Sequence, residues 1–429
     1  MRPQPRTAVA GGLTALALLA AACGGNDSPS SSATTAKAGL GATPKAVPGF
    51  DPATGTIKVG IISPLTGPVA SIGKPLTAGN EVFFNKVNAK GGIAGKYKIV
   101  FEERDSAYVP QQAVQAYNEL KGDVVLFAQV LGTASTKAVL SSLKADGIIA
   151  SPASLDADWV REPNLLPIGA PYQVQAINAL TWYVTEGGGK GKKICSLAQD
   201  DAYGKAGLQG VDFAAQKNAF TVAAAKTFTA TKGDEGGPAV QALKDAGCDA
   251  VFLVSTPSDT GKLLGIAAKT GFAPQWIGQS PSYTSALATS PLKDYLAQTF
   301  MVASEGTEWG DTSVLGMKNM LADIAQHKPD QQPDYYFAFG YDQASAVAQV
   351  LEKAVALGDL SHAGIMKATE EVGTLTFDGL TGDYVYGKAD ARVFPRETTL
   401  FKVDPTKPVG LAVVKKSFVT EQAKAFKIG

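Results

Sequence analysis

The chain has 429 residues, with 39 basic and 39 acidic side chains, so its formal net charge at pH 7 is zero. Without a surplus of basic residues it has little electrostatic attraction for nucleic acid or for an anionic membrane surface, and we expect neither as a partner. Beyond its N-terminal region the chain keeps about 380 residues, enough for two cores at roughly 150 residues per domain.

The N-terminus has the pattern of a secretory signal peptide. Two arginines precede a mostly apolar run at 8–19, three alanines follow, and then comes Cys23. The run is shorter than the ~20 residues that a membrane-spanning helix needs. Small residues that end at a cysteine resemble a lipobox, in which the thiol is diacylated, although Ala20 stands where that motif favours leucine. We predict a lipoprotein signal peptide over 1–22 and lipidation at Cys23; the alternative is an ordinary cleaved signal with an incidental cysteine.

The segment after Cys23 has the composition of a flexible tether. Residues 24–50 are almost entirely Gly, Ser, Thr, Ala and Pro, which offer too little apolar surface to form a core. We predict that 23–55 is a disordered tether. An acylated cysteine followed by a tether implies an extracytoplasmic domain, held by lipid on the outer face of the cell membrane.

The first half of the remaining chain alternates short β-branched runs with segments of helical apolar spacing. We predict strands over 56–63, 97–105, 124–132 and 148–154, and helices over 75–92, 111–122 and 135–147. Strand and helix in units of about 30 residues predict a parallel sheet with helices on both faces.

The same alternation then begins again. We predict strands over 192–201, 221–228, 249–256 and 275–280, and helices over 202–218, 239–247 and 261–271. These elements form a second α/β lobe. A long helix at 341–357 and a strand-like tail at 392–404 must return to one lobe or the other.

Three strands of the first half end in loops of small or hydroxylated residues: SPLTGP, LGTAST and SPASL. In open parallel sheets, ligands bind beyond the carboxyl ends of the strands, so a small molecule is expected there. The alternative is that these residues only form turns.

Two cysteines lie in the second lobe. Cys195 begins its first strand and Cys248 precedes its third, and these strands are neighbours in a doubly wound order. An oxidising compartment would allow a disulfide between them, although a buried free cysteine is equally common.

At several places the sequence resembles the type I periplasmic solute-binding proteins of the branched-chain amino acid class, from 56 to about 404. The matching segments are IKVGIISPLTGP with the following N-AKGGI-G turn, QQAVQAYNEL, GIIASPAS, AQDDAYGKAG and DAVFLVST, in this order. Members have two Rossmann-like lobes joined by three crossings and deliver the enclosed ligand to an ABC permease.

The resemblance implies an α/β fold with a three-segment hinge and sets the lobe boundaries. The N-terminal lobe would comprise 56–170 and 305–376, and the C-terminal lobe 171–304 and 377–429. The crossings would lie near Gly169 to Tyr172, Val302 to Glu305 and Thr376 to Gly379.

Part of the family's ligand site is preserved. The hydroxyl and the backbone group with which members hold the ligand carboxylate fall at Thr133 and Ala153, and an aromatic of the second lobe falls at Tyr203. The full set of expected ligand-binding residues is Ile72, Leu131, Gly132, Thr133, Ala153, Ser154, Leu155, Tyr203, Thr256 and Ser280.

Other positions of the site depart from the family. Leu155 replaces a threonine, Thr256 replaces a tyrosine, and Ser280 replaces the glutamate that pairs with an amino acid's ammonium group. An ammonium buried without an anion costs several kcal/mol. The pattern favours a small ligand with a carboxylate or amide end and an uncharged remainder. The alternative is an amino acid whose ammonium meets Asp156 or Asp201, each of which is more simply interpreted as a solvated loop carboxylate.

Enzyme motifs are absent or incomplete. GQSPS at 278–282 lacks the last glycine of a nucleophile elbow, and GGGKGKK at 187–193 lacks the spacing of a phosphate loop. The chain has two histidines and no CxxC or HExxH, so we expect no enzyme activity, cofactor or metal.

The sequence therefore predicts a monomeric, lipid-anchored solute-binding protein of an ABC importer, which captures a small molecule and docks on the permease. The alternatives are an amino-acid-binding protein of the same class and a sensor that does not transport; a sensor ectodomain would continue into a transmembrane helix, which we do not expect here.

Overall fold

The computed structural model describes residues 43–428. The predicted signal peptide, Cys23 and the first part of the predicted tether lie outside the described residues. Within the described part of the chain, no helix is both long and apolar enough to cross a membrane.

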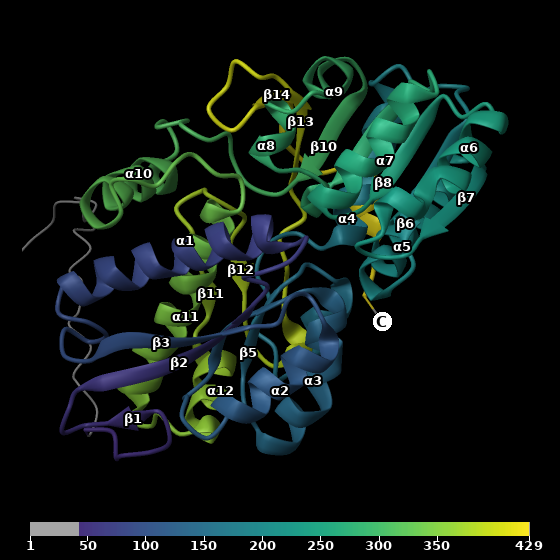
Figure 1. The fold of residues 1–429 in the computed structure, drawn as a ribbon. Coiled ribbons are helices and arrows are strands. Elements are labelled where there is room, and N and C mark those ends of the chain that lie inside the picture. The colour runs from purple at the N-terminus through teal and green to yellow at the C-terminus, as the bar shows by residue number, and fades with distance from the viewer. Residues whose placement is uncertain (1–42, 429) are drawn as a thin grey trace, which may run out of the picture. The chain divides into compact units, whose positions relative to one another are not determined.

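The first lobe is built on a five-stranded sheet in which β3 and β4 flank β2, and β5 lies beyond β4 (Figure 1). Its strands are β1 (Phe50–Asp51), β2 (Thr56–Ser63), β3 (Lys98–Asp105), β4 (Phe127–Leu131) and β5 (Ala150–Ala153). Strands β2 to β5 are parallel, as predicted, and β4 and β5 are buried along their whole length. This burial on both faces explains their nearly continuous apolar sequence.

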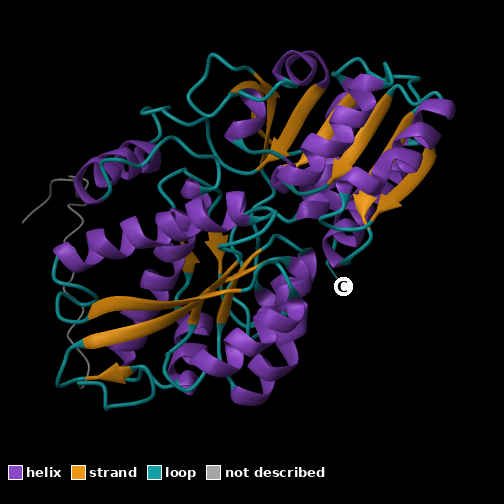
Figure 2. Cartoon of the chain, in the orientation of Figure 1, coloured by secondary structure: helices purple, strands orange, loops and turns teal. Residues whose placement is uncertain are grey.

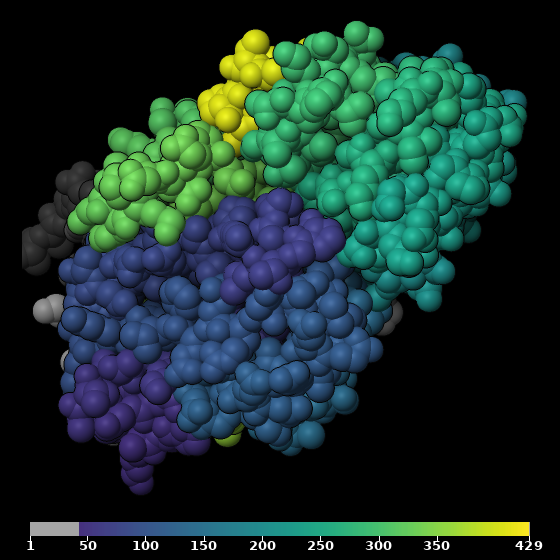
Figure 3. All heavy atoms as spheres, in the orientation of Figure 1, coloured from purple at the N-terminus to yellow at the C-terminus, as the bar shows by residue number. Residues whose placement is uncertain are grey.

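Helices cover both faces of this sheet. They are α1 (Ala70–Ala89), α2 (Pro110–Leu120), α3 (Thr133–Asp146), α10 (Leu315–His327), α11 (Phe337–Leu357) and α12 (His362–Glu371), with a short 3-10 helix at Ala157–Arg161. Helices α2 and α3 pack together on one face, and α1 packs along α11 on the other. In Figure 3, atoms of α10 (light green) lie against the purple and blue residues of this lobe.

The second lobe has a seven-stranded sheet in the order β14-β13-β10-β9-β8-β6-β7. Figure 2 draws its strands as orange arrows at the upper right. Its strands are β6 (Ile194–Gln199), β7 (Val222–Phe228), β8 (Ala250–Val254), β9 (Gln275–Gln279), β10 (Phe300–Ser304), β13 (Thr398–Val403) and β14 (Leu411–Phe418). Strands β6 to β10 are parallel, and β13 and β14 join antiparallel at one edge.

Helices again cover both faces. They are α4 (Tyr172–Thr185), α5 (Ala202–Asn218), α6 (Gly237–Asp245), α7 (Pro257–Lys269), α8 (Ser285–Ala288), α9 (Lys293–Thr299) and α13 (Glu421–Ala425), with 3-10 helices at Gly233–Gly236 and Ser280–Ser282. Helices α4 and α5 pack together on one face, and α6 and α7 on the other. The protein is therefore an α/β fold of two lobes.

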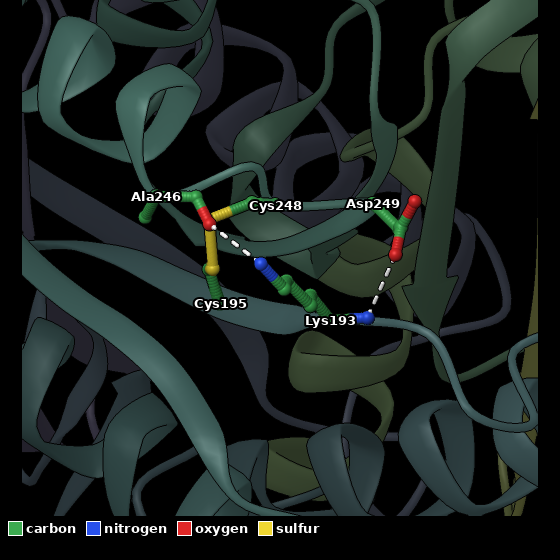
Figure 4. Close-up of a disulfide and its surroundings, with 5 residues drawn as sticks. All are labelled: Lys193, Cys195, Ala246, Cys248 and Asp249. Atoms are coloured by element: carbon green, nitrogen blue, oxygen red, sulfur yellow. Dashed lines mark hydrogen bonds between the residues drawn. A yellow bond between two sulfur atoms is a disulfide. The ribbon is translucent and has the colours of Figure 1, made fainter.

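Strands β6 and β8 are parallel neighbours, so they bring the two cysteines together. Cys195 and Cys248 form a disulfide with a Cα–Cα distance of 5.9 Å (Figure 4). Beside it, the backbone N–H of Lys193 donates to Asp249 Oδ2 at 2.8 Å, which ties the start of β6 to the loop before β8.

The predicted tether extends too far. Strand β1 pairs antiparallel with β2, and Phe50 is only 3% exposed, its ring meeting Tyr97 edge to face at a centroid distance of 5.1 Å. Gly49 has φ +82°, and a Cβ there would lie 2.4 Å from the backbone nitrogen of Val125. The residues from Val47 onward therefore belong to the fold, because one aromatic anchors a segment whose composition otherwise indicates disorder.

The third crossing lies later than Thr376 to Gly379. The hairpin of β11 (Thr374–Leu375) and β12 (Tyr384–Val385) remains with the first lobe, where Tyr386 donates its hydroxyl to the Pro167 carbonyl. Arg392 is 2% exposed and donates to the carbonyls of Glu162 and Leu165 at 2.9 and 3.0 Å.

A 3-10 helix at Ala389–Ala391 completes this segment. The chain reaches the second lobe only between Phe394 and Thr398, so the boundary predicted at 377 is wrong. The hydrogen bonds of the Arg392 guanidinium to carbonyl groups of the first lobe offset its burial, and with the bond from Tyr386 they hold this segment on the first lobe.

Candidate functional site

One cavity of about 110 Å³ lies where loops of both lobes meet, beyond the carboxyl ends of β4, β5, β8 and β9. All ten residues expected at a ligand site line it: Ile72, Leu131, Gly132, Thr133, Ala153, Ser154, Leu155, Tyr203, Thr256 and Ser280. In each sheet the strand order reverses beside these loops, between β2 and β4 and between β6 and β8. The general rule for open α/β sheets places a ligand at such points.

The first lobe contributes a polar end to the cavity at the N-terminus of α3. Gly132 is the N-cap residue with φ +103°, and it provides no side chain to satisfy the first N–H groups of the helix. Thr133 Oγ1 is buried and has no hydrogen-bond partner among residues 43–428. A helix N-terminus carries partial positive charge, so this end suits a carboxylate or a carbonyl oxygen.

The second lobe contributes Tyr203, Thr256 and Ser280, but two of their hydroxyls already have partners. Tyr203 donates to the carbonyl of Ser255 at 3.4 Å, and Thr256 donates to Asp259 Oδ2 at 3.1 Å. Ser280 is 4% exposed and begins the short 3-10 helix after β9. The second lobe thus offers the ligand mainly apolar and aromatic surface.

Much of the cavity wall is apolar. Ile72 lies in the first turn of α1, which begins at Ala70, before the predicted start at 75. Further apolar lining residues, which the sequence did not indicate, are Leu76, Trp309, Met317, Phe339, Leu380, Phe401, Val409 and Leu411. Such a wall suits a ligand with an apolar body.

Four tyrosines line the cavity besides Tyr203: Tyr108, Tyr172, Tyr335 and Tyr336. Tyr172 packs edge to face on Tyr203 at 5.0 Å, and Tyr335 donates to Ser304 Oγ. The paired tyrosines before α11 were the one sequence signal that could have indicated this wall, since adjacent aromatics at a helix start are unusual in a solvated loop.

The two acids considered as replacements for the family's glutamate do not line the cavity. Asp156 caps the 3-10 helix at Ala157–Arg161, accepts from Gln173 Nε2 at 3.0 Å and is 3% exposed, so its interpretation as a solvated loop carboxylate is wrong. Asp201 caps α5 and accepts from the Gly204 N–H at 2.9 Å. Both carboxylates serve local structure.

Three other acids do line the cavity: Glu305, Glu308 and Asp342. Glu305 Oε2 accepts from Gln175 Nε2 at 2.6 Å. Asp342, on α11, is 4% exposed, and its carboxylate has no hydrogen bond or ion pair among the described residues. Burial raises the pKa of Glu305 to about 7 and holds the pKa of Asp342 well above its usual range.

No lysine, arginine or histidine is among the described residues that line the cavity. Over residues 43–428 there is also no group of three or more His, Cys, Asp or Glu side chains placed to hold a metal ion. The cavity therefore combines a polar group at the start of α3, the acidic side chains Glu305 and Asp342, and a largely apolar wall.

Residues 56–408 match the family described as Periplasmic binding protein. The chain belongs to this family. The resemblance that the sequence indicated is thereby confirmed, and the two lobes are those of the type I fold.

Among curated proteins, this binding protein is 30% identical over 212 residues to "Leu/Ile/Val-binding protein homolog 3" of Brucella melitensis. That match covers 48% of this chain and 56% of the relative. "Leu/Ile/Val-binding protein BraC3" of Rhizobium johnstonii is 31% identical over 202 residues, 46% of this chain and 54% of the relative. The chain thus spans a little over half the length of these relatives.

Among solved structures, the binding protein is similar to a fatty acid ABC transporter substrate-binding protein from Thermomonospora curvata, with a TM-score of 0.83 and 28% identity, covering 90% of this chain and 97% of that chain. A branched-chain amino acid ABC transporter protein from Thermus thermophilus with bound valine has a TM-score of 0.70 and 15% identity, covering 86% and 98%. The second likeness concerns the fold alone.

Proposed function

We propose that this chain is an extracytoplasmic solute-binding protein of an ABC importer, which holds a small molecule between its lobes and delivers it to a permease. The family match supports the binding role, and the names of the similar proteins support the transporter class. The lining of the cavity and the family match support binding as the role that we propose.

The ligand class that we propose is a carboxylate, or an amide, with an uncharged apolar body. The observation that carries this proposal is the make-up of the cavity: an unpartnered Thr133 hydroxyl at the N-terminus of α3, followed by apolar walls, with Ser280 where the family places a glutamate. The similar structure from Thermomonospora curvata is named for fatty acids, which have this chemistry.

An amino acid is the second candidate, and one specific feature favours it. Glu305 and Asp342 could supply the anion that Ser280 lacks, because both carboxylates line the same cavity. The names of the relatives, which refer to leucine, isoleucine and valine, also support an amino acid ligand.

Titration calorimetry on the chain from residue 43 onward distinguishes the candidates. Leucine is compared with 4-methylpentanoate, which has the same carbon skeleton without the ammonium group, and with the longer octanoate. We expect 4-methylpentanoate and octanoate to bind and leucine to bind much more weakly. Tight leucine binding with weak binding of its deaminated analogue would overturn the proposal.

We further propose that the mature protein is a monomer, anchored by acylated Cys23 on the outer face of the cell membrane. The signal-like sequence that ends at this cysteine supports the anchor. A sensor without transport is the remaining alternative, and a permease gene beside the gene for this chain would count against it.

A further inference from the structure

The cavity has an uneven charge balance. Glu305, Glu308 and Asp342 line it, and no basic side chain among the described residues does. Glu308 has a cation of its own, because Lys407 Nζ lies 3.5 Å from its Oε1. Glu305 and Asp342 have none, and Gln175 is the single described side chain that hydrogen-bonds to either carboxylate.

A carboxylate ligand makes this imbalance worse. If Glu305 and Asp342 were both ionised, an anionic ligand would bring a third negative charge into a cavity lined largely by apolar and aromatic side chains. Like charges that share a buried site cannot all stay ionised, because neither water nor a counter-ion offsets their repulsion. The simplest relief is a proton on one of the carboxyl groups.

We infer that Glu305 and Asp342 together hold one more proton in the ligand-bound state than in the free state, so that the protein takes up a proton when it binds an anionic ligand. This inference rests on the proposed function, because a ligand with an ammonium group would balance the two carboxylates by itself. The protonated acid is neutral and can donate a hydrogen bond, so it becomes a determinant of specificity for anions over zwitterions.

The groups that face the pair are neutral phenols or acids. Glu305 faces Tyr172 of α4 and Tyr335 and Tyr336 before α11, whose phenol pKa values are all raised well above the usual range by burial. Those phenols stay neutral. The charged groups that act on Asp342 are the carboxylates of Glu305 and Asp378.

Calorimetry of octanoate binding in buffers of different ionisation enthalpy counts the protons directly. Near pH 8 the free Glu305 is largely ionised, since its pKa is about 7, and we expect uptake of close to one proton. Near pH 6 the uptake should be small. By linkage, octanoate affinity should then fall about tenfold per pH unit above pH ~7.

Two variants identify the carboxyl groups. Glu305→Gln and Asp342→Asn each replace a carboxyl by a neutral group of the same shape, so octanoate should still bind, with less proton uptake and a flatter pH dependence; the double variant should take up none. Asp311→Asn is the matched control, because Asp311 lies on the same segment outside the cavity and pairs with Lys416 at 3.0 Å. It should keep the wild-type proton count.

The outcomes separate the inference from the proposed function. Octanoate binding without proton uptake overturns the inference and leaves the proposed function standing. Leucine binding without octanoate binding overturns both, because the two carboxylates then balance an ammonium. The wild-type proton count decides the inference even if a variant does not fold.

Discussion

Tyr336, from the first lobe, donates its phenolic hydrogen to the backbone carbonyl of Pro281, in the second lobe, at 3.1 Å. The same hydroxyl also meets the carbonyl of Tyr283. Its ring lines the cavity, so one side chain both bounds the ligand space and joins the two lobes beside it.

Replacing Tyr336 by phenylalanine should weaken ligand binding. The variant keeps the ring but loses the bonds across the lobes, and the loss of about 0.5–1.5 kcal/mol corresponds to roughly twofold to twelvefold in affinity. Titration calorimetry measures it. Tyr386→Phe is the control, since its hydroxyl bonds within the first lobe, and it should lower the free energy of unfolding with no change in affinity. Equal affinity losses in both variants would argue against a role for Tyr336 between the lobes.

Thr133→Val should change stability and binding in opposite directions. The hydroxyl is buried without a partner, so its removal should raise the free energy of unfolding of the unliganded protein by about 1 kcal/mol. A carboxylate ligand would lose a charge-assisted bond, which corresponds to a tenfold or greater loss of affinity by the same scale. Thermal unfolding and calorimetry test the two effects. Unchanged affinity for octanoate would show that the ligand's head lies elsewhere.

Removal of the disulfide should destabilise the second lobe. Cys195 and Cys248 close a loop with a sequence separation of 53, for which the chain-entropy estimate is about 4 kcal/mol. Denaturant unfolding of the double variant Cys195→Ala with Cys248→Ala should show a loss of this order. Mass spectrometry without reduction provides the direct check, and two thiols open to alkylation would contradict the bridge.

The stability of the unliganded protein should depend on pH through Glu305. Burial raises its pKa from 4.5 to about 7, so the folded state binds the proton more tightly than the unfolded state. The stabilisation from this proton is complete below pH ~4.5 and is lost as pH rises through about 7. Glu305→Gln lacks this dependence, so the melting temperature of the variant minus that of the wild type should increase as pH rises from about 5 to about 8. A constant difference across that range would contradict the raised pKa.

The anchor is testable by metabolic labelling. We expect a palmitate analogue to label the wild-type protein, which should partition into detergent, and Cys23→Ala to abolish both properties. The absence of label on the wild type would rule out lipidation at Cys23.

Local sequence was sufficient for most strands of the two sheets, whereas β1, β10 and β14 were not predicted. The strands of the first lobe and most of those of the second are short β-branched or apolar runs between turn residues, and this pattern comes from burial of each strand within its own α/β unit. Helix α5 has the predicted bounds, since Asp201 supplies a cap before an amphipathic stretch. Helix α4 was not predicted, because nearly all of its residues are buried. Without a solvent-exposed polar face, its sequence lacks the helical spacing of apolar residues that marks an amphipathic helix.

The loops at the strand ends were also accessible from sequence, because a parallel sheet places them at one edge whatever the rest of the chain does. That is why Thr133 and Ala153 lie together at one edge of the first sheet. Ser280 follows β9 of the second sheet, and it shares their cavity only because loops of the two lobes meet there.

Tertiary structure alone decided the acidic end of the cavity. Glu305 follows β10 and Asp342 lies on α11, and neither stands in a motif that indicates a shared site. They line the same cavity for two reasons. The chain crosses from the second lobe to the first at Glu305, and α11, which carries Asp342, packs along α1. The raised pKa of Glu305 has the same origin, since a carboxyl group is desolvated by what the fold places around it and not by its neighbours in sequence.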